Sequence, residues 1–262
     1  MSVAIDTMRA ERIKLTSVQS PWWCTAVIVA LGLGGLAAIL GVAAKASMSA
    51  DDETVRFYPT VDVAVSGGVT GFGVLVLMIL AALSVTSEYR FGVIRSTFQA
   101  LPNRSVVLVV KALFIGVLGG AILSGVLALS AFYLTKALAG PEAGRDLVLE
   151  GSAGRTIYGT ALFALLASIL AVGGVGALLR QSAGTIAILL LWPMLIESLF
   201  GLFGSFGRNV QPFLPFANIN YFLGTDQGID FHWGPWGAFL YFAVFVLVVF
   251  GAAVAVVNRR DA

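Results

Sequence analysis

Six long apolar segments constrain this chain more than any other feature of its sequence. A helix needs about 20 apolar residues to cross the hydrocarbon core of a bilayer, because each residue rises by about 1.5 Å. Strands of a membrane barrel would instead alternate polar and apolar residues over about ten positions. We therefore predict an all-α integral membrane protein with six transmembrane helices, which cover residues 22–44, 67–86, 106–135, 155–179, 185–206 and 235–257.

The composition agrees with a chain that lives in lipid. Charged residues make up 11% and hydrophobic residues 58% of the 262 residues. Soluble domains carry about 25% charged residues, so this chain cannot cover its apolar surface in water. Its net charge of +2, without a basic patch that has interleaved aromatic residues, gives no reason to expect a nucleic-acid partner.

The positions of lysine and arginine predict the orientation of the spans. With six spans, both termini share one side of the membrane, and that side receives ten of the sixteen cations. These ten are Arg9, Arg12, Lys14, Arg90, Arg95, Arg104, Lys111, Arg180, Arg259 and Arg260. The other six share the opposite side with nine acidic residues. We expect a multi-pass protein of the cytoplasmic (inner) membrane with cytoplasmic termini and a short tail over residues 258–262.

Residues 1–21 precede the first span and mix charged with apolar side chains. The apolar ones recur at mostly helical spacing, which favours a short amphipathic helix lying in the cytoplasmic interface. They are Ile5, Met8, Leu15 and Val18. Ser20-Pro21 is expected to end this helix, and Trp22-Trp23 follow where an aromatic belt belongs. A frayed polar tail is the alternative.

The connection between the second and third spans contains more charged and helix-forming residues than a passive linker needs. It covers residues 84–104, SVTSEYRFGVIRSTFQALPNR. Residues 87–100 have the length of three to four helical turns, with Ser87 as N-cap and Glu88 near the positive helix end. Arg95 follows two turns later on the same side as Glu88. An apolar face is formed at i, i+3 and i+7 by Phe91, Ile94 and Phe98. Two interpretations stay open: a docking helix for a partner protein, or an interfacial helix without one.

Glu197 is the ionisable residue that stands out within a predicted span, in the sequence LLLWPMLIESLFGLFG. A carboxylate in hydrocarbon is costly and points to a function by default. Pro193, four residues earlier, removes a backbone hydrogen bond and predicts a kink. Three interpretations remain: contact with a substrate or proton, structural pairing with a neighbouring helix, or a place at the outer interface. Residues 208–234 follow outside the membrane, and their many aromatic side chains favour a packed, partly membrane-dipping segment over a flexible loop.

Motifs for catalysis and for metal binding are missing from the sequence. With one histidine and one cysteine, no HExxH site or Cys-rich metal site is possible. No G-x-S-x-G nucleophile elbow occurs, and no lysine follows a glycine, so the chain has no Walker A loop. We therefore expect no catalytic residue, no metal and no cofactor in this chain. Polar residues within the spans are too sparse for an open ion channel.

Three stretches resemble the membrane-spanning subunit of ABC-2-type ABC transporters, in an actinobacterial style. They are AERIKLTSVQSPWW before the first span, SEYRFGVIRSTFQALPNRSVVLVVKAL after the second, and LWPMLIES with FLPFA around the fifth. The middle stretch is the most specific, with Glu88, Tyr89, Arg90, Gly92, Pro102, Arg104 and Lys111 at the positions of the family pattern. Val93 departs from it, because the family often has threonine after the glycine.

The resemblance implies one half of a transporter. Two permease subunits would pair, as homodimer or heterodimer, and would bind two separate cytoplasmic ATPase subunits that hold ATP and Mg²⁺. The stretch after the second span would be a coupling helix seated in a cleft of the ATPase, with Glu88, Tyr89, Arg90, Gly92, Arg95, Pro102 and Arg104 as its coupling residues. The expected function is export of an amphiphilic substrate, such as a drug, lipid or peptide. The alternative is a membrane assembly or regulatory protein that uses the same fold without transport.

Overall fold

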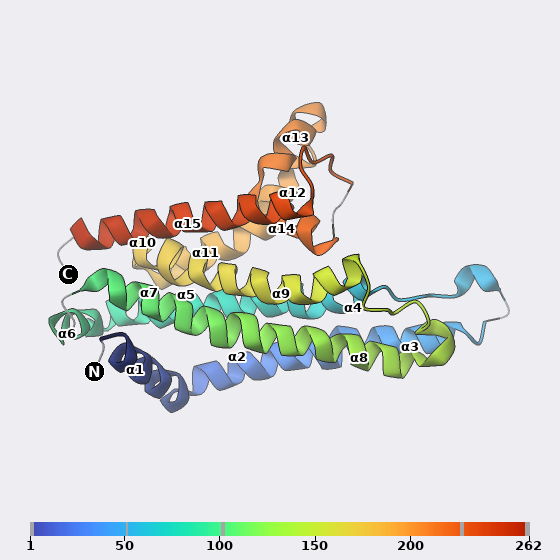
Figure 1. Cartoon of the computed structure of the whole chain (residues 1–262), viewed down its shortest axis with the longest axis horizontal. Helices are drawn as coiled ribbons and strands as arrows, with labels where there is room; N and C mark the ends of the chain where they lie inside the picture. The colour runs from blue at the N-terminus through green and yellow to red at the C-terminus, as the bar shows by residue number, and fades with distance from the viewer. Residues whose placement is uncertain (1–2, 51, 101–102, 226–227, 260–262) are drawn as a thin grey trace.

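The long helices of the protein run side by side in an elongated bundle (Figure 1). The computed structural model describes residues 3–50, 52–100, 103–225 and 228–259. Within these ranges all regular secondary structure is helical and there is no strand, which confirms the all-α part of the predicted fold class. Helix α1 (Val3–Ser17) begins and helix α15 (Pro235–Arg259) ends at one end of the bundle, beside the short helix α6 (Val93–Ala100). We call this the terminal end and the opposite one the distal end.

Six of the described helices are long and apolar enough to cross a membrane, which makes the chain a multi-pass membrane protein. The first five each contain a wider, π-type turn that divides the span into pieces. The first span comprises α2 (Gln19–Val29), η1 (Ala30–Ala37) and α3 (Ala38–Ser47), and the second α4 (Val61–Val65), η3 (Ser66–Gly73) and α5 (Val74–Arg90). The third comprises α7 (Arg104–Ile115), η4 (Gly116–Leu123) and α8 (Ser124–Ala143). The fourth comprises α9 (Ser152–Ile169), η5 (Leu170–Gly176) and α10 (Ala177–Leu179).

The fifth and sixth spans are shorter than the third. The fifth comprises α11 (Ser182–Leu191), η6 (Trp192–Ile196) and α12 (Glu197–Phe200), and the sixth is the single helix α15 (Pro235–Arg259). The sequence places the end of the fifth span at residue 206, but the helix stops six residues earlier. Gly201 begins a turn there, and Gly204 adopts a φ of 58° that a continuing right-handed helix does not allow. The third span runs eight residues beyond its predicted end, past a break at Gly140.

Glycine allows close helix contacts in the interior of the bundle. A side chain on Gly120 would meet the backbone of Ala164 at 2.7 Å, and one on Gly68 would meet Gly32 at 2.8 Å. Small residues at such contacts let helices approach closely in lipid, where dispersion rather than the hydrophobic effect drives association. The second, third and fourth spans bury more of their side chains than the other three. The first, fifth and sixth spans therefore form the periphery.

Helix α1 (Val3–Ser17) precedes the first span and packs against α7. The chain leaves it at Val18, which is extended with φ −105° and ψ 143°. The predicted break at Ser20-Pro21 is therefore wrong by two residues. Pro21 lies in the first turn of α2, where its missing N–H would have no helical partner. The position of α1 in a membrane interface stays a prediction.

The segment between the fifth and sixth spans folds into short packed helices, α13 (Gly204–Val210), η7 (Gln211–Phe213) and α14 (Pro215–Leu223). Figure 1 shows α12 and α13 standing out from the bundle beside the start of α15. The buried side chain of Asn218 donates to the carbonyls of Pro212 and Leu214, and accepts a hydrogen bond from Trp233 at 2.8 Å. Stacking of Trp233 on Tyr241, with ring centroids 5.5 Å apart, ties this segment to α15. The described part of residues 208–234 is therefore packed, as the aromatic content predicts.

Candidate functional site

Four charged side chains from three helices form a cluster at the terminal end, which we call the charge cluster. Glu88 lies in the last turn of α5, Lys111 in α7, and Glu11 and Lys14 in α1. Lys111 Nζ lies 2.7 Å from Glu88 Oε1 and 3.1 Å from Glu11 Oε1. Lys14 Nζ lies 2.5 Å from Glu88 Oε1 and 3.3 Å from Glu11 Oε1. Two carboxylates and two ammonium groups alternate, so the charge cluster is neutral overall.

Most of the charge cluster is withdrawn from solvent. The side chains of Glu11, Lys111 and Glu88 are 4%, 3% and 7% exposed. Taking an ion out of water costs several kcal/mol, which is offset only where the opposite charges and hydrogen bonds around it are well placed. Each charge here has two opposite partners, and Lys111 also donates to the carbonyl of Ser84 at 3.1 Å. The charge cluster therefore fastens α1 and α7 to the end of α5.

Lys14 is the member of the charge cluster that reaches solvent, with 41% of its side chain exposed. Partial burial lowers the pKa of Lys14, but the hydrogen bonds and negative charges of Glu88 and Glu11 outweigh it. The pKa of Lys14 therefore lies above its usual range. This ammonium group remains charged throughout the neutral pH range, and its ion pairs hold α1 against α5.

A second contact holds the end of α5 from the turn between the fourth and fifth spans. Arg180 ends α10 with φ 54° and ψ 11°, the left-handed region that costs a non-glycine residue roughly 1–2 kcal/mol. Its guanidinium carbon lies 4.9 Å from the centroid of the Tyr89 ring, a cation–π contact worth about 0.5–2 kcal/mol. Ser182 Oγ donates to Thr86 Oγ1 at 2.9 Å. The α10–α11 turn is thus fixed to the last turns of α5.

The surface helix begins later than the sequence predicts. Helix α5 continues to Arg90 because no proline or glycine interrupts it before Gly92, and the hydroxyl of Ser87 donates to the carbonyl of Leu83 instead of capping a new helix. Gly92 turns the chain with φ 69°, and α6 follows. The single helix predicted over 87–100 is therefore two helices. Glu88 lies in α5 and belongs to the charge cluster, whereas Arg95 lies in α6 beyond the turn at Gly92. The prediction that the two share one side of a single helix is therefore wrong.

The remaining coupling residues have different environments. Arg90 is exposed, and its guanidinium carbon lies 5.7 Å from the centroid of the Phe91 ring. Phe91 is 73% exposed and Ile94 only 7%, so they do not share one buried face as predicted. Arg104 begins α7 and donates through Nη1 to the carbonyl of Val257 at 3.5 Å, toward the end of α15. The side chains of Arg95 and Phe98, and residue Pro102, lie outside what the structure describes.

Glu197 lies at a different place, where α12 meets the start of α14. Its Oε1 accepts hydrogen bonds from Trp192 Nε1 and from the Phe216 amide, both at 3.0 Å, and its Oε2 accepts one from the Ala217 amide at 2.7 Å. The first N–H groups of a helix have no partner within the helix and carry its positive dipole end. A carboxylate from another helix satisfies them here. This geometry matches the structural-pairing interpretation, and Pro193 lies in the wider turn η6 just before it.

No family model, curated protein or solved structure matches this chain. Within the described ranges, no group of three or more His, Cys, Asp or Glu side chains is placed to hold a metal ion.

Sequence reasoning missed most of the charge cluster. It singled out Glu88 and named Lys111 in the family pattern, but gave no role in a site to Glu11 or Lys14, nor to Arg180 outside the charge cluster. One signal was available: Lys111 lies inside the predicted span 106–135, and a lysine at that depth requires an acidic partner. Glu11 has no comparable signal, because it lies 77 residues before Glu88 in a polar segment. Only the position of α1 beside α7 brings the two carboxylates onto the same lysine.

Proposed function

We propose that this chain is the permease subunit of an ATP-driven ABC exporter of the cytoplasmic membrane. It pairs with a second permease subunit, identical or different, and with two separate cytoplasmic ATPase subunits that hold ATP and Mg²⁺. The observation that carries this proposal is the short helix α6, which follows Gly92 outside the spans. The end of α5 just before it is held by the ion pairs of the charge cluster. The family resemblance of the same residues supports it.

The contacts around α6 suit a coupling helix that is displaced by a partner protein. A passive connection between two spans needs only a few residues, and no buried charges at its base. Here a displacement of α6 reaches α1 and α7 through Glu88, and the α10–α11 turn through Tyr89. Nucleotide-driven closure of the ATPases would bias the bundle between two states by contacting α6 differently in each. Glu88 and Tyr89 act as transmitting residues, whereas the exposed Arg90 and Phe91 face the partner.

The experiment uses Arg90→Glu in the full-length protein, co-expressed with any ABC ATPase that is encoded beside it. Arg90 is exposed and outside the charge cluster, so the substitution is expected to leave the thermal unfolding temperature unchanged. Co-purification of the ATPase and ATP-dependent transport in vesicles should both fall. Arg145→Glu reverses an exposed arginine beyond the distal part of α8 and is the matched control.

Two results would refute the proposal. The first is a detergent-solubilised protein that never associates with an ATPase. The second is an Arg90→Glu variant that retains wild-type association and transport. A complex that contains the ATPase but transports no amphiphile in any vesicle assay would favour the alternative, a regulatory or assembly protein. The apolar walls of the spans suit an amphiphilic substrate such as a drug, lipid or peptide.

A further inference from the structure

The two sides of α1 are used in opposite ways. Its inward side carries polar groups, because Thr7 and Glu11 are buried and Glu11 belongs to the charge cluster. Its outward side carries exposed cations together with exposed apolar side chains. These are Arg9, Arg12, Ile5, Met8 and Ile13, the last of them 65% exposed. A helix packed only against protein would bury the apolar residues and expose the polar ones.

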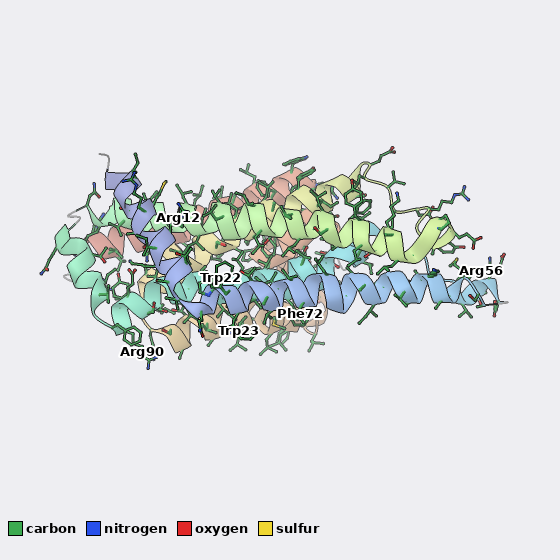
Figure 2. All side chains as sticks on the ribbon, turned by 90° about the horizontal axis from the view of Figure 1, so that it is seen from below. Arg12, Trp22, Trp23, Arg56, Phe72 and Arg90 are labelled. Atoms are coloured by element: carbon green, nitrogen blue, oxygen red, sulfur yellow. The ribbon has the colours of Figure 1, made fainter. Side chains whose placement is uncertain are left out.

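Helix α1 lies directly before the first span, at the level where phospholipid headgroups are expected. The first span begins at Gln19, two residues after α1 ends at Ser17. Trp22 and Trp23 in its opening turns are 65% and 69% exposed, and exposed tryptophan pairs at the start of a span mark the headgroup level. Figure 2 shows α1 crossing the terminal end of the bundle, with Arg12 on it and Trp22 beside it. The outward side of α1 is therefore exposed next to this tryptophan pair.

The charges of this surface select an anionic partner. Helix α1 holds Arg9, Arg12 and Lys14 against two acids. Glu11 is buried against Lys111, and the side chain of Asp6 lies outside what the structure describes. Arg12 is exposed, and its guanidinium makes no ion pair or hydrogen bond with the described residues. A guanidinium group binds phosphate oxygens in a bidentate geometry, and anionic lipids concentrate in the cytoplasmic leaflet.

We propose that the outward side of α1, with Arg9 and Arg12 at its centre and Trp22 at its edge, binds anionic phospholipid headgroups of the leaflet at the terminal end. This binding holds α1 in the position where Lys14 and Glu11 meet Glu88 and Lys111. Without anionic lipid, α1 packs less firmly on α5 and α7, and the end of α5 that precedes α6 is held less firmly as well. This binding involves only this chain and the lipid around it, so it occurs with or without transport activity.

Hydrogen exchange of the α1 amides in lipid nanodiscs tests this proposal. The full-length protein is compared in discs of phosphatidylcholine alone and in discs with about 30% phosphatidylglycerol. We expect stronger protection of α1 in the anionic discs. Each basic residue near an anionic surface contributes about fivefold in binding, so Arg12→Gln should reduce the anionic-lipid gain about fivefold. Salt at about 1 M shortens the Debye length to about 3 Å and should remove most of the gain.

Arg145→Gln is the control, since this exposed arginine lies beyond α8 at the distal end. It should keep the full response of α1 to anionic lipid. Equal α1 protection in neutral and anionic discs would overturn the proposal. So would an Arg12→Gln variant that responds like the wild type. A variant with weaker α1 protection in both kinds of disc would also overturn it, because Arg12 would then act within the protein rather than on lipid.

Discussion

Replacing Lys111 by methionine removes one charge from the charge cluster while keeping a long, apolar side chain in its place. Glu11 and Glu88 then share a buried site with only Lys14. Removing one member of a buried ion pair typically costs about 3–5 kcal/mol. A protein of this size loses about 2–4 °C of unfolding temperature per kcal/mol. Lys111→Met should therefore unfold about 6–20 °C below the wild type.

A second substitution separates the charge imbalance from the loss of packing. In the double variant Lys111→Met/Glu88→Gln, Glu11 and Lys14 remain as one balanced pair at 3.3 Å. Neighbouring residues in one ion network show interaction energies of about 0.5–3 kcal/mol. The double variant should therefore be more stable than the sum of the two single losses predicts, by an amount in this range.

The assay is intrinsic tryptophan fluorescence during heating in detergent, which the five tryptophans of the chain make possible. Lys136→Met is the control, because Lys136 Nζ donates to the carbonyl of Leu147 at 2.7 Å but forms no ion pair with a described residue. This substitution removes one hydrogen bond from a charged donor and a contact 5.8 Å from the centroid of the Phe132 ring, and should cost about 1.5–3 kcal/mol, less than the loss of an ion-pair partner at Lys111. The reasoning fails if Lys111→Met unfolds at the temperature of Lys136→Met, or if the double variant loses the full sum of both single changes.

Four further outcomes are expected. Glu197→Gln should lower the unfolding temperature, since glutamine offers one acceptor oxygen where the two oxygens of Glu197 accept three hydrogen bonds, and each lost hydrogen bond costs about 0.5–1.5 kcal/mol; lost transport at unchanged stability would instead assign Glu197 to substrate or proton contact. Gly92→Ala should cost roughly 1–2 kcal/mol at its φ of 69°, and a more stable variant would contradict that backbone conformation. Arg180→Gly should be more stable than Arg180→Ala by about the same amount, because both lack the guanidinium and only alanine keeps the left-handed strain; equal stabilities would show that no strain is present. The pKa of Lys14 is raised, so its ion pairs stabilise the fold below that pKa and are lost as pH rises through it. The difference in stability between the wild type and Lys14→Met should therefore narrow above about pH 10. A difference that stays constant with pH would exclude ion pairing as its source.

The spans could be located from the sequence because the bilayer imposes a length and a polarity on every crossing segment. The same rule predicts helix ends less well, since an apolar run shows where lipid is tolerated and not where hydrogen bonding stops. Gly201 ended the fifth span early for this reason, and α5 continued through Glu88 to Arg90. The short helix after the second span was predicted from spacing, but its first turn, residues 87–90, belongs to the span.

The charge cluster and the anchoring of Glu197 were beyond the reach of the sequence. Both depend on contacts between segments far apart in the chain: Glu11 with Lys111, and Glu197 with the amides of Phe216 and Ala217. Nothing in a local pattern tells whether a carboxylate faces a partner protein, a lysine or a helix end. The positions of α1 and α14 decide that.

That this protein is a bundle of membrane helices follows from its residues alone, because 58% hydrophobic residues in six runs admit no soluble fold. The polar, helix-forming segment between the second and third spans can be recognised in the same way. The partners of Glu88 depend instead on how the helices pack. Packing of α1 and α7 against the end of α5 brings two lysines onto one carboxylate oxygen, and an ion that is buried must be paired by whichever charges the fold places within reach.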